Sequence, residues 1–214
     1  IAGAHEIPED VLLRILVAPG GGTLEVLVRA PLEAMRDFDW PLHGPGYLDL
    51  ERVEPLLADA AALWLADGLR FEADGEPLPR PTLRSARLSL PTDRSFGSLE
   101  SAREHLAAAP VPIGTPLVPA QALLDVRFEI PLADPDARLS LTPELARLGV
   151  RTTTVLLFRT PDGADRVYRY TGDPERLRLD PGWHHAAWSF VRLGFDHILE
   201  GVDHLLFLAC LVLP

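Results

Sequence analysis

Residues 11–29 read VLLRILVAPGGGTLEVLVR, and this stretch decides the fold class. Its first half is rich in branched apolar residues, which favour β-strands. Three glycines at 20–22 follow. The second half then alternates apolar and polar residues, which places Leu24, Val26 and Val28 on one face. Two such runs around a glycine turn predict a β-hairpin that ends at Pro31.

Similar patterns predict strands through most of the chain. Two further hairpins are expected around Asp74-Gly75 and around Pro161-Asp162-Gly163. Single strands are expected at 83–90 and 123–132, with a short edge at 177–179 and a loop at 37–46.

Three helices are expected among these strands. Apolar spacing indicates a helix over 50–68 with Gly68 as its C-cap, and Ser98 caps a second helix that runs to 109. Pro143 stands at the first position of a third, short helix. The fold class is therefore mainly β or α+β. We expect an antiparallel, sandwich-like domain over 5–180. The segment 183–214 would follow it as the start of a membrane domain.

The terminal segment 194–214, GFDHILEGVDHLLFLACLVLP, joins ionisable residues to an apolar run. On a helix, five of them fall within an arc of roughly 120°. They are Asp196, His197, Glu200, Asp203 and His204. Such residues in a membrane helix usually face a bundle interior or a transport path. A span of about 20 residues fits if it starts near Trp188, so we expect a first transmembrane helix with others following.

This ending resembles the first membrane helix of the HupE/UreJ family, with its pattern Gly-Phe-x-His…Gly-x-Asp-His-Leu-Leu-Phe. The residues that carry the resemblance are Gly194, Phe195, His197, Gly201, Asp203, His204, Leu205, Leu206 and Phe207. Nickel-permease members usually carry proline directly after the first histidine. Ile198 stands there in this chain, which leaves the metal open. In long members a β-rich extracytoplasmic domain precedes the membrane part.

The resemblance implies a bacterial inner-membrane protein for uptake or handling of a divalent transition metal, nickel foremost. Its partners would be the metal ion, the lipid bilayer and a protein that the extracytoplasmic domain binds. His197, Asp203 and His204 would be metal ligands or relay groups, and Asp196 and Glu200 would orient them or provide a path for charge. By the helix rise, His197 and His204 lie roughly 10 Å apart, so a second helix would have to complete a site.

Two other classes of function stay open. One is a membrane-anchored binding or assembly module without transport activity. The other is a membrane-embedded enzyme that uses the polar residues for metal-assisted hydrolysis. No familiar catalytic motif is present in the sequence, so we expect a protein that is not an enzyme.

Smaller features carry weaker hypotheses. Ala2-Gly3-Ala4 fits a signal-peptidase site that would leave His5 at the mature N-terminus. A terminal histidine could chelate copper with His43 or His105, although a plain exposed terminus is the favoured interpretation. His184-His185 would collect metal or, as we prefer, form part of an interfacial belt.

Composition excludes some classes. A net charge of −11 argues against binding to nucleic acid, and the single cysteine, Cys210, excludes an internal disulfide. The loop residues Asp93, Asp134 and Asp136 could bind calcium, but such acidic loops are commonly just solvated. Trp40, Trp64 and Phe128 are expected in the core.

Overall fold

The computed structural model describes residues 7–179, which belong to a compact unit that ends at Leu179. The expected membrane helix and all five polar residues of the terminal segment lie outside this range. The boundaries 5–180 and 183–214 therefore stay a prediction. Among residues 7–179, no helix has both the length and the apolar character that a membrane crossing needs.

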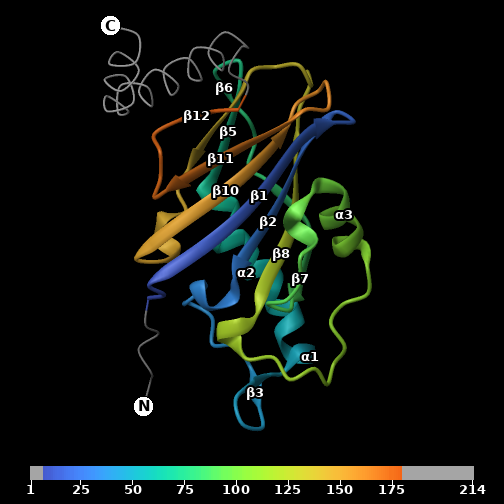
Figure 1. Ribbon diagram of the computed structural model, residues 1–214, viewed down its shortest axis with the longest axis vertical. Coiled ribbons are helices and arrows are strands. Elements are labelled where there is room, and N and C mark those ends of the chain that lie inside the picture. The colour runs from blue at the N-terminus through green and yellow to red at the C-terminus, as the bar shows by residue number, and fades with distance from the viewer. Residues whose placement is uncertain (1–6, 180–214) are drawn as a thin grey trace, which may run out of the picture. The chain divides into compact units, whose positions relative to one another are not determined.

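A six-stranded sheet forms the centre of the domain, in the order β11-β10-β1-β2-β8-β7 (Figure 1). Its strands are β1 (Asp10–Gly20), β2 (Thr23–Pro31), β7 (Thr82–Ser89), β8 (Leu123–Pro131), β10 (Arg151–Arg159) and β11 (Asp165–Thr171). The predicted hairpin at the start of the chain is confirmed as β1 and β2. Gly21 and Gly22 both have positive φ, a conformation that glycine adopts without steric cost. Neighbouring strands are antiparallel except β1 and β10, which pair in parallel.

A second sheet of four short strands has the order β12-β9-β5-β6. It consists of β5 (Leu69–Ala73), β6 (Glu76–Pro77), β9 (Leu139–Pro143) and β12 (Leu177–Arg178). The expected short edge at 177–179 is thus confirmed. Within the predicted loop 37–46, a small two-stranded ribbon begins, made by β3 (Leu42–His43) and β4 (Tyr47–Leu48).

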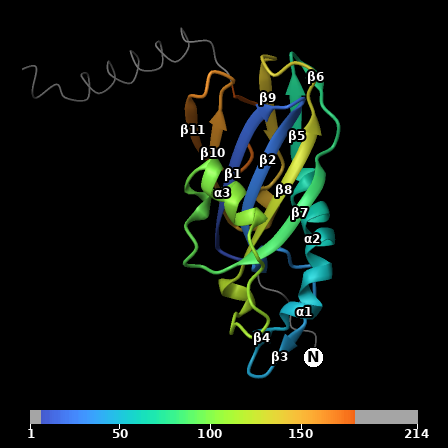
Figure 2. The ribbon, with the colours of Figure 1, turned by 90° about the vertical axis from the view of Figure 1, so that its right-hand side faces the viewer.

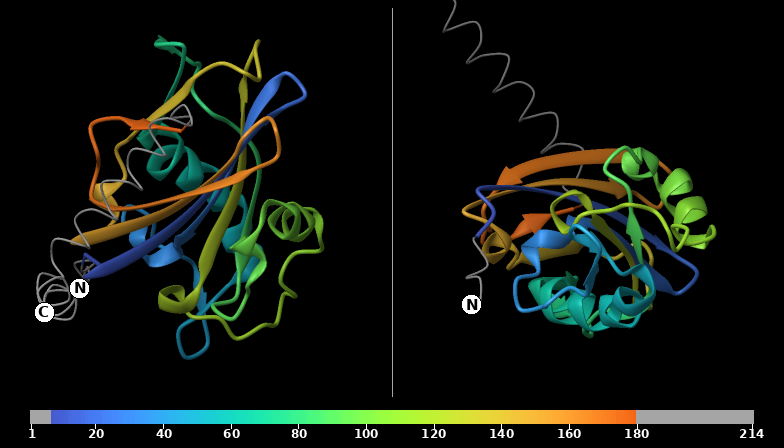
Figure 3. Two further views of the ribbon diagram at one scale, coloured as in Figure 1. Left: turned by 45° about the horizontal axis from the view of Figure 1, so that its top comes forward. Right: turned by 90° about the horizontal axis from the view of Figure 1, so that it is seen from below.

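Residues 7–179 contain three short α-helices, of which the second and third contact strands of the six-stranded sheet (Figure 2). They are α1 (Leu50–Val53), α2 (Leu57–Trp64) and α3 (Leu99–Ala107). The segment of α1 and α2 lies on one side of the sheet and α3 on the other, as the view from below also shows (Figure 3). Single 3-10 turns complete the backbone at Leu32–Ala34, Glu54–Leu56, Ala66–Gly68, Ser95–Gly97, Pro119–Gln121 and Ala146–Leu148.

The main core lies between one face of the six-stranded sheet, the second sheet and α2. The alternation in the strands decides this, because every second residue of β2 and β8 points inward. Phe128 of β8 and Trp64 of α2 are buried, and Trp40 is half-buried against the same core. The predicted core positions and the β-rich, α+β fold class are confirmed.

Two of the predicted helices differ in the structure. The helix over 50–68 is interrupted because Pro55 has no N–H group, and a 3-10 turn there separates α1 from α2. The prediction that a helix begins at Pro143 is wrong. Pro143 instead ends β9, where it pairs with Leu69 of β5. The backbone N–H groups of the next turn are bound by the carboxylate of Asp173, a contact that local sequence does not reveal.

Gly68 ends a 3-10 turn without the positive φ that its predicted role as a C-cap implies. Its importance is steric. A Cβ atom at this position would lie 2.6 Å from Leu145 Cδ2 and 2.8 Å from the carbonyl oxygen of Glu144. The chain therefore needs glycine at 68 so that the end of the helical segment can approach the end of β9 closely.

Candidate functional site

The outer face of the six-stranded sheet, beneath α3, holds a buried group of charged residues. Arg29 of β2 and Asp125 of β8 are directly opposite in register. The Arg29 guanidinium donates to both carboxylate oxygens of Asp125, with Nε–Oδ1 and Nη2–Oδ2 distances of 2.6 Å. The Asp125 side chain is fully buried, and that of Arg29 is 7% exposed. Two-point pairing of this kind is what makes a buried charge tolerable.

Asp93, in the loop after β7, is a second carboxylate on the same guanidinium. Arg29 Nη2 donates to Asp93 Oδ1 at 2.7 Å, and the backbone N–H of Ser95 donates to the same oxygen at 2.9 Å. Burial opposes ionisation of Asp93, but the hydrogen bonds from Ser95 and Arg29 outweigh it and hold the pKa of this carboxyl well below its usual range. Burial likewise opposes the charge of Arg29, yet Asp125 and Asp93 together raise its pKa above the ordinary value.

His105 of α3 links the two carboxylates. Its Nε2 lies 3.0 Å from Asp125 Oδ2 and its Nδ1 lies 3.3 Å from Asp93 Oδ2. Ser89 of β7 completes the arrangement, because its hydroxyl donates to Asp125 at 2.5 Å and lies 2.7 Å from His105 Nε2. We call these five residues, Arg29, Ser89, Asp93, His105 and Asp125, the ionic cluster.

The ionic cluster contains a serine, a histidine and two aspartates, which are the residue types of a hydrolase triad. A nucleophilic serine must reach a substrate and must pass its proton to the histidine. Ser89 is only 1% exposed, and its hydroxyl is directed at Asp125. The geometry therefore fits a structural role, in which the cluster fixes α3 on the sheet.

The position of α3 follows from its N-terminal cap, from apolar side chains on its inner face and from hydrogen bonds at its C-terminus. The Ser98 hydroxyl accepts the N–H of Ser101 and caps the helix, as predicted. Leu99 and Ala102 are buried against the sheet. Near its C-terminus, the guanidinium of Arg87 in β7 binds the carbonyl oxygens of His105, Ala108 and Ala109, which satisfies groups that a helix end leaves unpaired.

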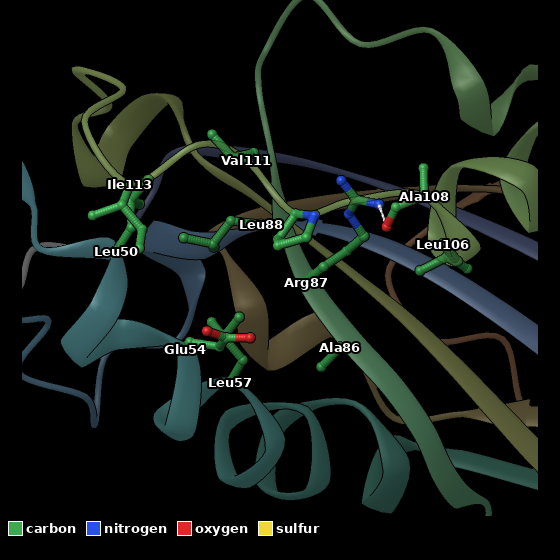
Figure 4. Close-up of a pocket in the computed structure, with 11 residues that line it drawn as sticks. Leu50, Glu54, Leu57, Ala86, Arg87, Leu88, Leu106, Ala108, Val111 and Ile113 are labelled. Carbon is green, nitrogen blue, oxygen red and sulfur yellow. Dashed lines mark hydrogen bonds between the residues drawn. The ribbon is translucent and has the colours of Figure 1, made fainter.

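A pocket of about 260 Å³ lies beside Arg87 (Figure 4). Residues of α1, the turn after it and the start of α2 form one wall, while the end of α3 and the segment 108–113 form the other. Figure 4 shows the Arg87 guanidinium turned toward Ala108, and Glu54 on the opposite wall. The lining residues are Leu50, Glu54, Leu57, Ala86, Arg87, Leu88, Leu106, Ala108, Pro110, Val111 and Ile113.

The metal ligands predicted from the sequence, Asp196, His197, Glu200, Asp203 and His204, lie outside the described residues, as do His5 and His184-His185. His43 and His105, the histidines considered as copper ligands with His5, lie within residues 7–179. His43 is exposed in β3, and His105 belongs to the ionic cluster. Between residues 7 and 179, no group of three or more His, Cys, Asp or Glu side chains is arranged to hold a metal ion.

Two of the three loop aspartates considered for calcium bind other groups of the protein. Asp93 binds Arg29, and the Asp134 carboxylate accepts the backbone N–H of Asp136. Arg29, Ser89 and Asp125 were missed from the sequence. The available signal was an arginine and an aspartate in the middle of apolar strands, on the face opposite the predicted core.

Together these features define a β-rich domain with a structural ionic cluster and a largely apolar pocket beside Arg87. A family model described as HupE / UreJ protein matches residues 174–214, so the resemblance to this family is confirmed over that segment. No curated protein matches the chain.

The match begins inside the described domain. It includes β12, and the following Leu179 is buried. Leu179 donates its N–H to the Leu139 carbonyl at 2.9 Å and accepts the Tyr168 hydroxyl at 2.8 Å. The first residues of the matched segment are therefore part of the β domain.

Proposed function

We propose that this chain belongs to a membrane protein that takes up or handles a divalent transition metal, with nickel foremost. HupE/UreJ proteins are associated with membranes and with nickel and cobalt transport. The observation that carries the proposal is the match to this family over 174–214, which includes both Asp-His pairs. The β domain lies on the extracytoplasmic side in this proposal, and the membrane part begins at about residue 183.

In this proposal the metal contacts His197, Asp203 and His204, while Asp196 and Glu200 orient these ligands. Imidazole and carboxylate groups together suit nickel, cobalt and zinc. The buried carboxylates of the β domain are unsuited to the same task, because Asp93 and Asp125 are both paired with Arg29. A metal ion at that place would have to displace a guanidinium that already satisfies them.

The test is metal binding to the intact protein in lipid nanodiscs, with nickel, cobalt, zinc and copper titrated in turn by calorimetry. The key variant is the double substitution His197→Ala/His204→Ala. The matched control is His43→Ala, which removes an exposed histidine of the β domain. We expect the double variant to lose at least tenfold in affinity for one of these metals and the control to keep it.

Two results would contradict the proposal. Failure of the unaltered protein to bind any of the four metals would remove metal handling as the function. Binding that persists at full strength in the double variant would place the ligands elsewhere in the protein.

A second function rests on a different observation. The pocket beside α3 opens at an edge of the sheet, which favours a binding or assembly role for the β domain. This role is compatible with metal handling by the membrane part.

A further inference from the structure

The pocket lies at the free edge of β7. Three consecutive residues of this strand, Ala86, Arg87 and Leu88, line it. Successive side chains of a strand point to opposite faces of the sheet. A pocket that touches all three must therefore lie beside the strand rather than above or below it.

This edge of the sheet is unpaired. β7 is the last strand in the sheet order, and its partner is β8. Within the described part of the chain, no backbone hydrogen bond other than those of the β7–β8 ladder involves Ala86, Arg87 or Leu88. Edge strands offer unpaired N–H and C=O groups to another chain, and most proteins cover or charge them.

The two walls of the pocket provide apolar surface on both sides of the edge. Leu50 and Leu57 come from the side of α1 and α2, and Leu106 and Val111 come from the side of α3. Ile113, which also lines the pocket, is 68% exposed. An extended peptide beside β7 would place alternate side chains against opposite walls.

The charge of the pocket selects the kind of peptide. Glu54 is exposed on the wall, and among residues 7–179 it has no ion pair or side-chain hydrogen bond. The other charged residue, Arg87, has its two terminal nitrogens bound to backbone carbonyls of the segment 105–109. The chain as a whole has a net charge of −11. A basic side chain is therefore the natural partner of Glu54.

From these observations we infer that the pocket binds an extended segment of a partner protein by strand addition to β7. The segment carries apolar residues at alternate positions and a lysine or arginine that faces Glu54. This inference extends the binding role of the β domain and does not depend on metal handling.

The experiment uses the intact protein in lipid nanodiscs and a fluorescent, N-acetylated nonapeptide in which threonine and valine alternate around a central lysine. Fluorescence anisotropy measures its affinity. We expect binding that weakens at least tenfold with Ile113→Asp and with Glu54→Lys. Val167→Asp is the matched control, since Val167 is 66% exposed on β11, the opposite edge of the same sheet, and we expect it to bind like the unaltered protein.

Three altered peptides test the mode of binding. Replacing the central lysine by glutamate should abolish binding to the unaltered protein and restore it to the Glu54→Lys variant. N-methylation of the backbone at alternate residues, made in both registers, should abolish binding in one register, because it removes the N–H groups that pair with β7.

Several outcomes would overturn the inference. These are no binding of the nonapeptide, equal binding of both N-methylated peptides, and equal weakening by Val167→Asp and Ile113→Asp. Dimerisation of the protein that Ile113→Asp abolishes would instead make a second copy of this chain the occupant. The metal titration described above is unaffected by each of these results, so the two proposals fail separately.

Discussion

The two faces of the six-stranded sheet are built from the same strands but are held by different forces. On the inner face, the side chains of Val26, Val28 and Phe128 are fully buried in a continuous apolar core. On the outer face, the neighbouring residues Arg29 and Asp125 belong to the ionic cluster beneath α3. Apolar burial stabilises without a particular partner group, whereas buried charges require their paired partners. The inner face thus supplies stability, and the outer face fixes the position of one helix.

The largest effect is expected from the inner face. Phe128→Ala should lower the free energy of unfolding by about 3–5 kcal/mol, because it removes a fully buried ring and leaves a cavity. Urea unfolding of the intact protein followed by circular dichroism measures the loss. The milder Phe128→Leu should cost less than half as much. Equal losses for the two variants would contradict a tightly packed inner face.

Loss of one partner in the ionic cluster should have the next largest effect. Asp125→Ala leaves Arg29 buried with only Asp93 as a carboxylate partner, and it should cost about 3 kcal/mol. Hydrogen exchange should show that α3 opens more often, since His105 and Ser89 also lose their shared acceptor.

The double variant Arg29→Met/Asp125→Leu sharpens the contrast between the faces. Replacing a buried ion pair by apolar residues of similar size is often close to neutral. We therefore expect it to be more stable than Asp125→Ala alone. A double variant less stable than the single one would show that the pair itself contributes net stability, as apolar packing does on the inner face.

These two faces were not equally predictable from the sequence. The period of two places Val26 and Val28 on one face and implies a core there. The same period leaves Arg29 and Asp125 on the other face, where the sequence alone suggests solvent. Their burial depends on α3, and Asp93 and His105 reach them from elements distant along the chain.

The same limit applies to β9 and to the pocket. Pro143 resembles the start of a helix, and only pairing with β5 shows that it ends a strand. A strand at 83–90 was predicted and β7 spans Thr82–Ser89, but its place at the sheet edge depends on strand order, which local patterns do not encode. The polar residues of the terminal segment are a different case, because helical spacing and the resemblance to the HupE/UreJ pattern predicted them, and they lie outside the described residues.

A smaller effect is expected at Gly68, where the 3-10 turn at Ala66–Gly68 lies close to the end of β9. Gly68→Ala should destabilise the domain by about 1–3 kcal/mol, because the added Cβ would collide with Leu145 and the backbone of Glu144. Gly97→Ala is the matched control, since open space surrounds that position. Urea unfolding of both variants tests the difference, and a neutral Gly68→Ala would show that β9 can move away from the turn.

The smallest effect is a loss of stability at acidic pH, which we expect from the ionic cluster on the outer face. The pKa of Asp93 in the folded protein lies well below its usual value, so its contribution to stability is complete above a pH of about 4, the ordinary pKa of an aspartate. That contribution is lost as the pH falls further toward the lowered pKa of the folded state. We expect about 1 kcal/mol to be lost through Asp93 between pH 5 and pH 2, measured by urea unfolding across this range.

Asp93→Asn should flatten this part of the profile, and Asp136→Asn, in an exposed loop, should leave it unchanged. An Asp93→Asn variant with the same acid dependence as the unaltered protein would mean that this loss of stability does not come from protonation of Asp93.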